Sequence, residues 1–329
     1  MPLIPIGLAK LKQMQYKINL FLCLIAFTLI GDAYSQNDTV ILPPTKEEVV
    51  RRTNAISTFN MFRDPSYILF GSGFGNLKPL IFEANIVPYF TISISEKVRW
   101  GVELSPQIIF RMYNEKSHPV RTPSFMPRVT FFYQFLDKES GKRDVFTYAS
   151  VMHHSNGQEE DFFNADSTIN TLTGDFSTNW AEAGIFLSRP NAKLQFNTNY
   201  IKLFATYNFL QEEKMSGAYG RLRFFANVKS TVKLSKAFRI IVAPDDKNKK
   251  YVFNQSIKLG WIAGKLNDEK AFNIKRLIFD YTLSFTPAFL RDIDVFIQYY
   301  YGQDYYNIHF GKQLSVIRIG ISSKSSFIF

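Results

Sequence analysis

Short segments in which apolar and polar residues alternate follow one another from about residue 66 to the end of the chain. In residues 277–286 (LIFDYTLSFT), every second side chain is large and apolar, and the side chains between them are mostly polar. Residues 293–301 and 316–329 repeat the pattern. Because successive side chains of a strand point to opposite faces, a period of two predicts β-strands with one apolar face.

One long apolar run, residues 19–31 (NLFLCLIAFTLIG), lies near the N-terminus, after several lysines and before Ala33-Tyr34-Ser35. A basic start, a short apolar stretch and small residues at −3 and −1 predict a secretory signal peptide, residues 1–35, cleaved before Gln36. A transmembrane helix is the alternative, but the run is shorter than the roughly 20 residues needed to span a bilayer.

The cysteine content and the net charge limit the partners that the chain could have. The single cysteine, Cys23, lies inside the predicted signal peptide, so the mature chain would have no disulfide. The formal net charge is +11, but an exported chain does not meet DNA, and no nucleic-acid partner is expected. Phosphate-rich lipid headgroups are the natural acidic surface, so the basic loops are expected to contact lipopolysaccharide.

The alternation alone would also suit a soluble sandwich. Segments of about ten residues, aromatic residues at their ends and the predicted export favour a membrane barrel, in which the sheet must close. The terminal Phe329 also resembles the last residue of bacterial outer-membrane proteins. We predict an all-β fold, a transmembrane antiparallel β-barrel of about 12 strands over residues 66–329, in the bacterial outer membrane. Residues 36–65 are expected to form a periplasmic lead-in.

Two of the four histidines occur together in VMHHSNG (residues 151–157). Asn-Gly is a common hairpin-turn signal, so the stretch could be only a polar tip. Strand alternation, however, places His153 and Ser155 on the face with small apolar residues, which in a barrel faces lipid. His154 is expected to point into the lumen.

The next predicted strand, residues 177–188 (STNWAEAGIFLS), has Asn179 on its apolar face. His153, Ser155 and Asn179 would then meet on the lipid side, where polar groups are costly unless they bond to one another. The three residue types suit acyl transfer, with Ser155 as nucleophile, His153 as base and Asn179 orienting the imidazole.

These residues resemble the outer-membrane phospholipase A family of Gram-negative bacteria. The resemblance is carried by HHSNG (153–157) and extends to residues 64–70, 118–121, 124–135 and 300–321. It implies a 12-stranded barrel that cleaves phospholipid acyl esters and is activated by calcium-dependent homodimerisation. The family order Ser-Trp-Asn is replaced here by Ser177-Thr178-Asn179-Trp180. Alignment on the tryptophan would not select Asn179, whereas strand parity does.

The resemblance also implies a Ca²⁺ site. Its ligands would fall near Ser117, at the backbone carbonyl of Gln158, and at Asp175 or Ser177. Carbonyl, hydroxyl and carboxylate oxygens are ligands that calcium accepts.

Two other functions stay open at this point. A lipid A deacylase-type barrel also uses His-x-Ser, but with a glutamate and in a smaller barrel. A non-enzymatic barrel would give no reason for His153, Ser155 and Asn179 to share the lipid face. No other cofactor motif is present in the sequence, and membrane phospholipids are the expected substrate.

Overall fold

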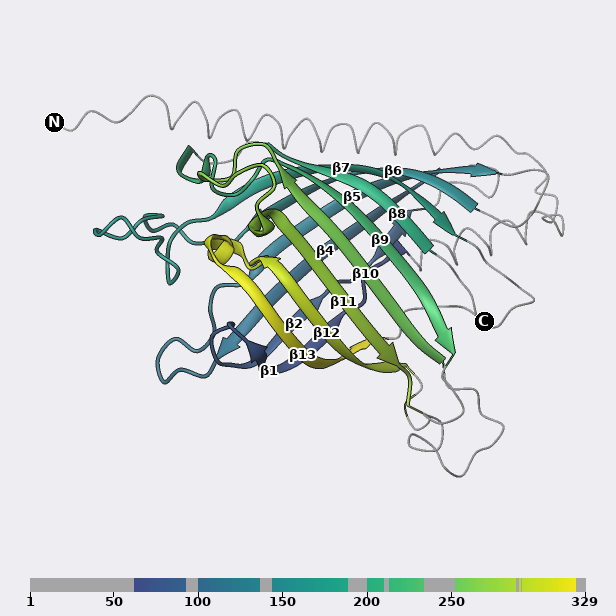
Figure 1. Ribbon diagram of the computed structural model, residues 1–329, viewed down its shortest axis with the longest axis horizontal. Helices are drawn as coiled ribbons and strands as arrows, with labels where there is room; N and C mark the ends of the chain where they lie inside the picture. The colour runs from purple at the N-terminus through teal and green to yellow at the C-terminus, as the bar shows by residue number, and fades with distance from the viewer. Residues whose placement is uncertain are drawn as a thin grey trace, which may run out of the picture. The chain divides into compact units, whose positions relative to one another are not determined.

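The computed structural model describes residues 62–92, 100–136, 144–188, 200–209, 213–233, 252–287, 290 and 292–323. Within these residues the chain forms thirteen strands (Figure 1). In order they are β1 (Tyr67–Gly75), β2 (Leu80–Ile86), β3 (Phe90–Ile92), β4 (Trp100–Tyr113), β5 (Ser124–Leu136), β6 (Asp144–Ser155), β7 (Ser177–Ser188), β8 (Tyr200–Phe209), β9 (Leu222–Lys233), β10 (Val252–Ala263), β11 (Leu277–Phe285), β12 (Ile293–Gln303) and β13 (Gln313–Ser323). The short 3-10 helices η2 (Glu213–Met215), η3 (Ile274–Arg276) and η4 (Asn307–Gly311) lie between strands.

The sheet closes on itself, with neighbouring strands antiparallel. β1 pairs with β13 and with β2, and β2 pairs with β4. β3 continues β2 along β4 in the same register: Ile86 lies opposite Ile108. Four residues further on, Phe90 lies opposite Leu104. β2 and β3 are thus two parts of one interrupted strand, and the described residues form a barrel of twelve strand positions, as predicted.

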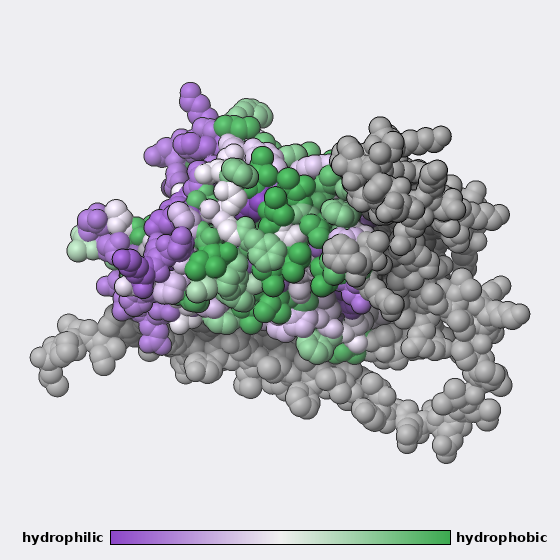
Figure 2. All heavy atoms as spheres, turned by 90° about the horizontal axis from the view of Figure 1, so that it is seen from below, coloured by the Kyte–Doolittle hydropathy of each residue, from purple (hydrophilic) through white to green (hydrophobic). Residues whose placement is uncertain are grey.

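The two faces of the strands have different surroundings, because one looks outward and the other into the lumen. The outward face of β6 carries exposed Ala149 and Val151, while Phe146, Tyr148 and Met152 on the other face are buried. Large apolar side chains are likewise exposed on the outer faces of the other strands, for example Phe131, Ile185 and Ile297. Figure 2 shows them as a broad hydrophobic band, with hydrophilic residues gathered at one end. The closed barrel and its apolar outer face support an outer-membrane location.

The predicted faces of β11, β12 and β13 are confirmed in the same way. Ile278, Asp294 and Arg318 are buried inside, whereas Ile297 and Ile319 are exposed outside. No helix among the described residues is long and apolar enough to cross a membrane. The predicted signal peptide, most of the predicted lead-in and the terminal Phe329 lie outside the described residues.

A row of prolines crosses three neighbouring strands. Pro88 falls in the gap between β2 and β3, at the level of Pro106 in β4, and Pro106 lies opposite Pro127 in β5. Proline has no N–H to give to a neighbouring strand. The ladder between β5 and β6 accordingly lacks its pairs at residues 126–127, and the register places Pro127 opposite His153.

One end of the barrel carries the β6–β7, β8–β9 and β12–β13 connections, to the left in Figure 1. An apolar cluster fills the space between them. Its buried members are Phe162, Phe176, Met215, Tyr219, Ile308 and Phe310. A second aromatic cluster lies near the other end of the strands, and joins Phe146 and Phe186, which face each other across β6 and β7, with Phe132, Tyr148 and Tyr200.

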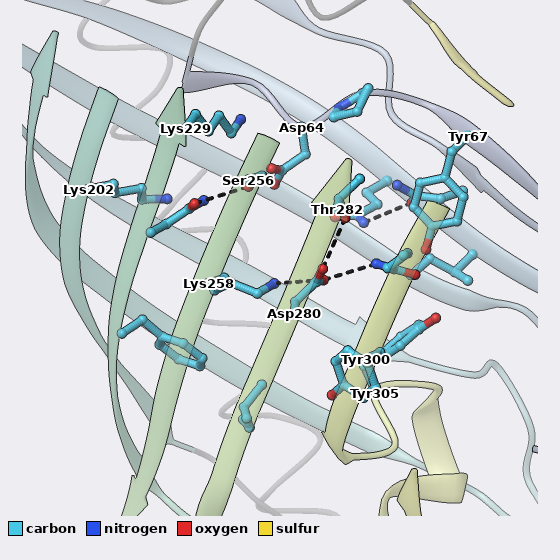
Figure 3. A pocket seen from close by; sticks show the side chains of 18 of the residues that line it. Asp64, Tyr67, Lys202, Lys229, Ser256, Lys258, Asp280, Thr282, Tyr300 and Tyr305 are labelled. Carbon is cyan, nitrogen blue, oxygen red and sulfur yellow. Dashed lines mark hydrogen bonds and ion pairs between the residues drawn. The ribbon is translucent and has the colours of Figure 1, made fainter. Parts of the chain in front are cut away.

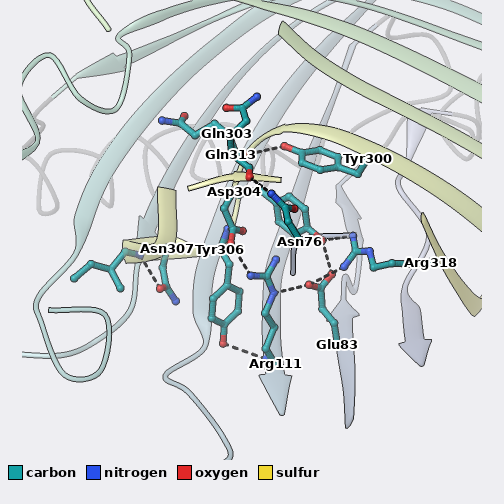
Figure 4. Close-up of polar contacts among 12 residues, drawn as sticks. Asn76, Glu83, Arg111, Tyr300, Gln303, Asp304, Tyr306, Asn307, Gln313 and Arg318 are labelled. Carbon is teal, nitrogen blue, oxygen red and sulfur yellow. Dashed lines mark hydrogen bonds and ion pairs between the residues drawn. The ribbon is translucent and has the colours of Figure 1, made fainter. Parts of the chain in front are cut away.

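A network of buried charges ties the η4 segment to the wall (Figure 4). Arg111 Nε donates to Glu83 at 2.6 Å, and its Nη1 donates to Asp304, which precedes η4, at 2.9 Å. Arg318 of β13 lies 3.1 Å from the same Glu83 carboxylate. Each charge has an opposite partner within bonding distance, as buried charges require.

Candidate functional site

The pairing of β6 with β7 brings the three predicted polar residues together. His153 lies directly opposite Asn179, and Ser155 lies opposite Ser177 at the end of the ladder. Since residues directly opposite one another share a face, His153, Ser155 and Asn179 all point outward, and each is partly buried. The register thus supports the parity argument for Asn179 over an alignment on Trp180, which faces inward.

A hydrogen bond links two of these side chains. His153 Nδ1 and Asn179 Oδ1 are 3.1 Å apart. The amide oxygen can only accept, so Nδ1 carries the proton, and the neutral imidazole keeps its lone pair on Nε2. Ser155 follows two residues later on the same strand face. The arrangement therefore holds a histidine in the tautomer that suits a general base, beside a hydroxyl.

The turn after Ser155 is held by a buried side chain. Asn156 Nδ2 donates to the Gly174 carbonyl at 2.8 Å, and its Oδ1 accepts from the backbone N–H groups of Gln158 and Phe176. Gly157 has a φ of 68°, a left-handed conformation that glycine adopts without strain. The chain therefore turns away from the strand directly after Ser155, and does not form a two-residue hairpin.

Apolar side chains flank the site on the outer wall. Phe125 lies opposite Ser155 on β5, and Phe209 lies opposite Asn179 on β8. The ring of Phe125 would lie 3.7 Å from a Cβ built on Gly157, so it covers the turn. Neither phenylalanine was singled out from the sequence, because the register between strands is needed to place them. They place one apolar side chain on each side of the site, on β5 and on β8.

His154 points inward, as predicted. It is buried, its ring centroid is 4.9 Å from that of Phe176, and neither ring nitrogen has a hydrogen-bond partner among the described residues. Phe176 in turn contacts Phe310 of η4, at 5.9 Å between centroids. The inner side of the site is thus apolar packing that reaches down to the η4 segment.

The predicted calcium ligands are only partly brought together. Asp175 and Ser177 lie at the start of β7, where Ser177 faces Ser155, and Gln158 follows the same turn. Ser117 is exposed in the β4–β5 loop, and no contact joins it to the others; Gln158 Nε2 does reach that loop, donating to Thr122 Oγ1 at 2.8 Å.

These donors are oxygens of the kinds that calcium accepts, and they fit such an ion in their chemistry. Among the described residues, however, no three acidic, histidine or cysteine side chains form a group that could hold a metal ion. A calcium ion would therefore depend on carbonyl, hydroxyl and water oxygens in addition to the carboxylate of Asp175.

Comparisons with known proteins add the following. No family model and no curated protein sequence matches the chain. Outer membrane phospholipase A from Escherichia coli matches as a solved structure, at 10% identity over 89% of this chain and 96% of that chain, with a TM-score of 0.48. An active-site mutant of that protein matches at 11% identity with the same coverage and a TM-score of 0.47.

Proposed function

We propose that the chain is an outer-membrane hydrolase that removes acyl chains from phospholipids. Ser155 is the nucleophile, His153 the general base and Asn179 the residue that orients the imidazole. The observation that carries the proposal is the His153–Asn179 hydrogen bond on the lipid-facing wall, with Ser155 two residues away on the same face. Polar groups that face hydrocarbon are costly unless they bond to one another, so three of them on this wall favour a functional role.

The steps follow from this arrangement. His153 Nε2 takes the proton of Ser155 Oγ as the oxygen attacks the ester carbonyl, and returns it to the leaving alcohol. Water, activated by the same nitrogen, then hydrolyses the acyl-serine and releases the fatty acid. Asn179 is neutral, so it fixes the tautomer and the ring orientation, but stabilises the imidazolium less than a carboxylate would.

The negative charge that develops on the carbonyl oxygen needs donors. The N–H of Gly157 has no acceptor among the described residues and lies at the turn that Asn156 holds. We assign it to the oxyanion. Calcium held by Gln158, Asp175 and Ser177, with Ser117 from the neighbouring loop, would supply further positive charge at this site.

The substrate class follows from the surroundings. Phe125 and Phe209 offer apolar contacts on the bilayer side, which suits acyl chains. A lipid A deacylase-type site would need a glutamate beside the histidine. Glu182 of β7 instead faces the lumen, where it accepts from Tyr148 at 2.6 Å and pairs with Lys202 at 3.1 Å. This placement favours the phospholipase.

A second copy of the chain is part of the proposal. We propose that a homodimer is the active form, with apolar outer walls in contact, and that basic loops meet lipopolysaccharide. Cross-linking of the protein in vesicles, with and without calcium, tests the first point. A rise in activity without any rise in cross-linked dimer would contradict it.

Fatty-acid release from phosphatidylcholine by the refolded protein, in calcium or in EDTA, tests the activity. Ser155→Ala is expected to lose roughly 10³-fold or more, since the nucleophile is removed. Ser150→Ala is the matched control, because Ser150 lies on the inward face of the same strand, bonded to Thr130. Fatty-acid release by folded Ser155→Ala equal to that of the wild type would overturn the proposal. Release by the wild type in EDTA would contradict only the proposed need for calcium.

A further inference from the structure

The turn that follows Ser155 is held by a contact from the β4–β5 connection. Gln158 Nε2 donates to Thr122 Oγ1 at 2.8 Å, across 36 positions of sequence. Among the described residues, neither side chain makes another hydrogen bond. Removing either group would therefore break this one link between the two connections.

Thr122 is fixed in turn from the inside of the barrel. Its backbone carbonyl accepts from Asn307 Nδ2 at 2.9 Å and from the Tyr306 hydroxyl at 3.1 Å, and both of these residues are buried. The Tyr306 hydroxyl also accepts from the backbone N–H of Arg111 at 3.2 Å. Arg111 belongs to the buried charge network (Figure 4). Thr122 is thus held by the same interior contacts that anchor η4.

The η4 segment has the lumen on one side and the β6–β7 connection on the other. Tyr305, shortly before η4, lines a lumenal cavity of about 350 Å³ (Figure 3). Ile308 reaches the opposite way, since a Cβ built on Gly174 would lie 2.9 Å from its Cδ1. The Gly174 carbonyl is the acceptor of Asn156 Nδ2. The segment therefore contacts the end of the β6–β7 connection directly, and reaches its start by way of Thr122.

The N–H of Gly157 lies between two residues that are held in place. Asn156 is bonded across the connection, and its Oδ1 accepts from the backbone N–H of Gln158 at 3.2 Å. Gly157 itself is exposed and has a φ of 68°. Because glycine has wide conformational freedom, its N–H keeps one direction only while its neighbours are fixed. Releasing the Gln158 side chain would leave the turn held on the Asn156 side alone.

We propose that Thr122 is a positioning residue for the site at Ser155. Its hydroxyl holds Gln158, and so keeps the N–H of Gly157 aimed at the oxyanion. The inference rests on the proposed function, because it gives this turn a task in ester hydrolysis. Donors fixed in advance stabilise developing charge without rearranging during the reaction. The interior of the barrel thus controls, through Thr122, a reaction that takes place on its outer wall.

Two substitutions of Thr122 separate its hydroxyl from its bulk. Thr122→Val keeps the shape and removes the acceptor, so kcat is expected to fall about tenfold with KM within about twofold, since the oxyanion donor is loosened but not lost. Thr122→Ser keeps the hydroxyl and should retain kcat within about twofold. The pH profile should not change, because the His153–Asn179 bond is untouched. Fatty-acid release by the refolded proteins at saturating calcium measures these values. An equal loss in both variants would overturn the role of the hydroxyl.

A double substitution tests whether the two side chains act through one bond. Gln158→Met removes the donor and keeps the length and the backbone carbonyl. Combined with Thr122→Val, it should lower kcat no further than the larger single loss, because both changes break the same contact. Additive losses would show that the two residues act separately, and would overturn the proposal.

Asn208→Ala is the matched control. Asn208 is also a buried amide, and its Nδ2 donates to the Gly220 carbonyl in the β8–β9 connection at 2.7 Å. It has no bond to the turn after Ser155, so kcat is expected to stay within about twofold of the wild type. A tenfold loss here as well would assign the effect to general loosening of this end of the barrel, and would overturn the proposal.

Amide hydrogen exchange reports on the turn without any substrate. Since the N–H of Gln158 is bonded to Asn156, its exchange measures opening of the turn. A peptide containing residues 156–158 should exchange faster in Thr122→Val and Gln158→Met than in the wild type, Thr122→Ser or Asn208→Ala. Unchanged exchange in the first two variants would overturn the proposal. If the wild type hydrolyses no phospholipid, the proposed function fails, and the exchange rates alone decide whether Thr122 holds the turn.

Discussion

His153 and His154 are neighbours in the chain, yet they occupy opposite environments. His153 points to the outer wall and has a hydrogen-bond partner in Asn179. His154 points to the inside, is buried against Phe176, and has no partner for either ring nitrogen among the described residues. One step along a strand thus separates a hydrogen-bonded imidazole on the outer wall from one that is packed inside without a polar partner among the described residues.

Matched substitutions give the largest expected effect on this comparison. His153→Phe is expected to lower ester hydrolysis roughly 10³-fold, because the proposed general base is lost. His154→Phe should leave activity within a few-fold of the wild type and should not lower stability, since an aromatic ring without unsatisfied nitrogens suits the site. Hydrolysis assays together with urea unfolding in detergent measure both. Equal losses of activity in two folded variants would make His154 a participant in the reaction.

Asn179 tests the outer side of the comparison more finely. Asn179→Ala removes the acceptor of His153 Nδ1–H, so the ring can rotate and change tautomer. We expect a loss of roughly 10²-fold in kcat, less than for His153 itself, because an amide contributes orientation without charge. Asn179→Asp should recover activity at least in part. A variant without any acceptor that kept full kcat would remove Asn179 from the proposed triad.

A third histidine, His309, offers a further test of how burial acts on an imidazole. His309 of η4 is buried against Tyr113, and burial, with Arg111, Lys312, Arg121 and Lys78 nearby, lowers its pKa to about 3. The unfolded chain takes up a proton near pH 6.5 that the folded chain refuses, so stability falls as the pH drops below that value. From pH 6.5 to 5.5 the loss from this group is about 1 kcal/mol.

His309→Phe is expected to remove this part of the acid sensitivity. The difference between the variant and the wild type, measured by unfolding at the two pH values, isolates it from other titrating groups. An identical loss of stability in both proteins would show that His309 is protonated in the folded chain.

Much of this arrangement could be predicted from the sequence, because strand alternation is a local property. Residues 177–188 were expected to form a strand and are β7, and the assignment of His153 and His154 to opposite faces is confirmed. Contacts between distant residues could not be predicted. Arg111 and Asp304 are 193 positions apart, and only the closed barrel brings them together.

The register between strands could not be predicted from the sequence either. Nothing in the local pattern indicates that Phe125 lies opposite Ser155, or that the segment beginning at Phe62 enters the lumen. The first depends on how far β5 slides along β6, and a slide of two residues leaves every face unchanged. The second depends on long-range packing of Phe62, which no local pattern encodes.

Pro127, next to His153, bears on the depth at which the barrel sits in a bilayer. Without an N–H from this position, a backbone carbonyl of β6 lacks its ladder donor, and hydrocarbon cannot supply another. Water and lipid headgroups can, so the polar boundary of the bilayer is expected at this level. Phospholipid ester groups lie at that same boundary. One missing backbone donor would thus determine the depth in the bilayer at which the barrel sits, and with it whether Ser155 lies level with the phospholipid esters.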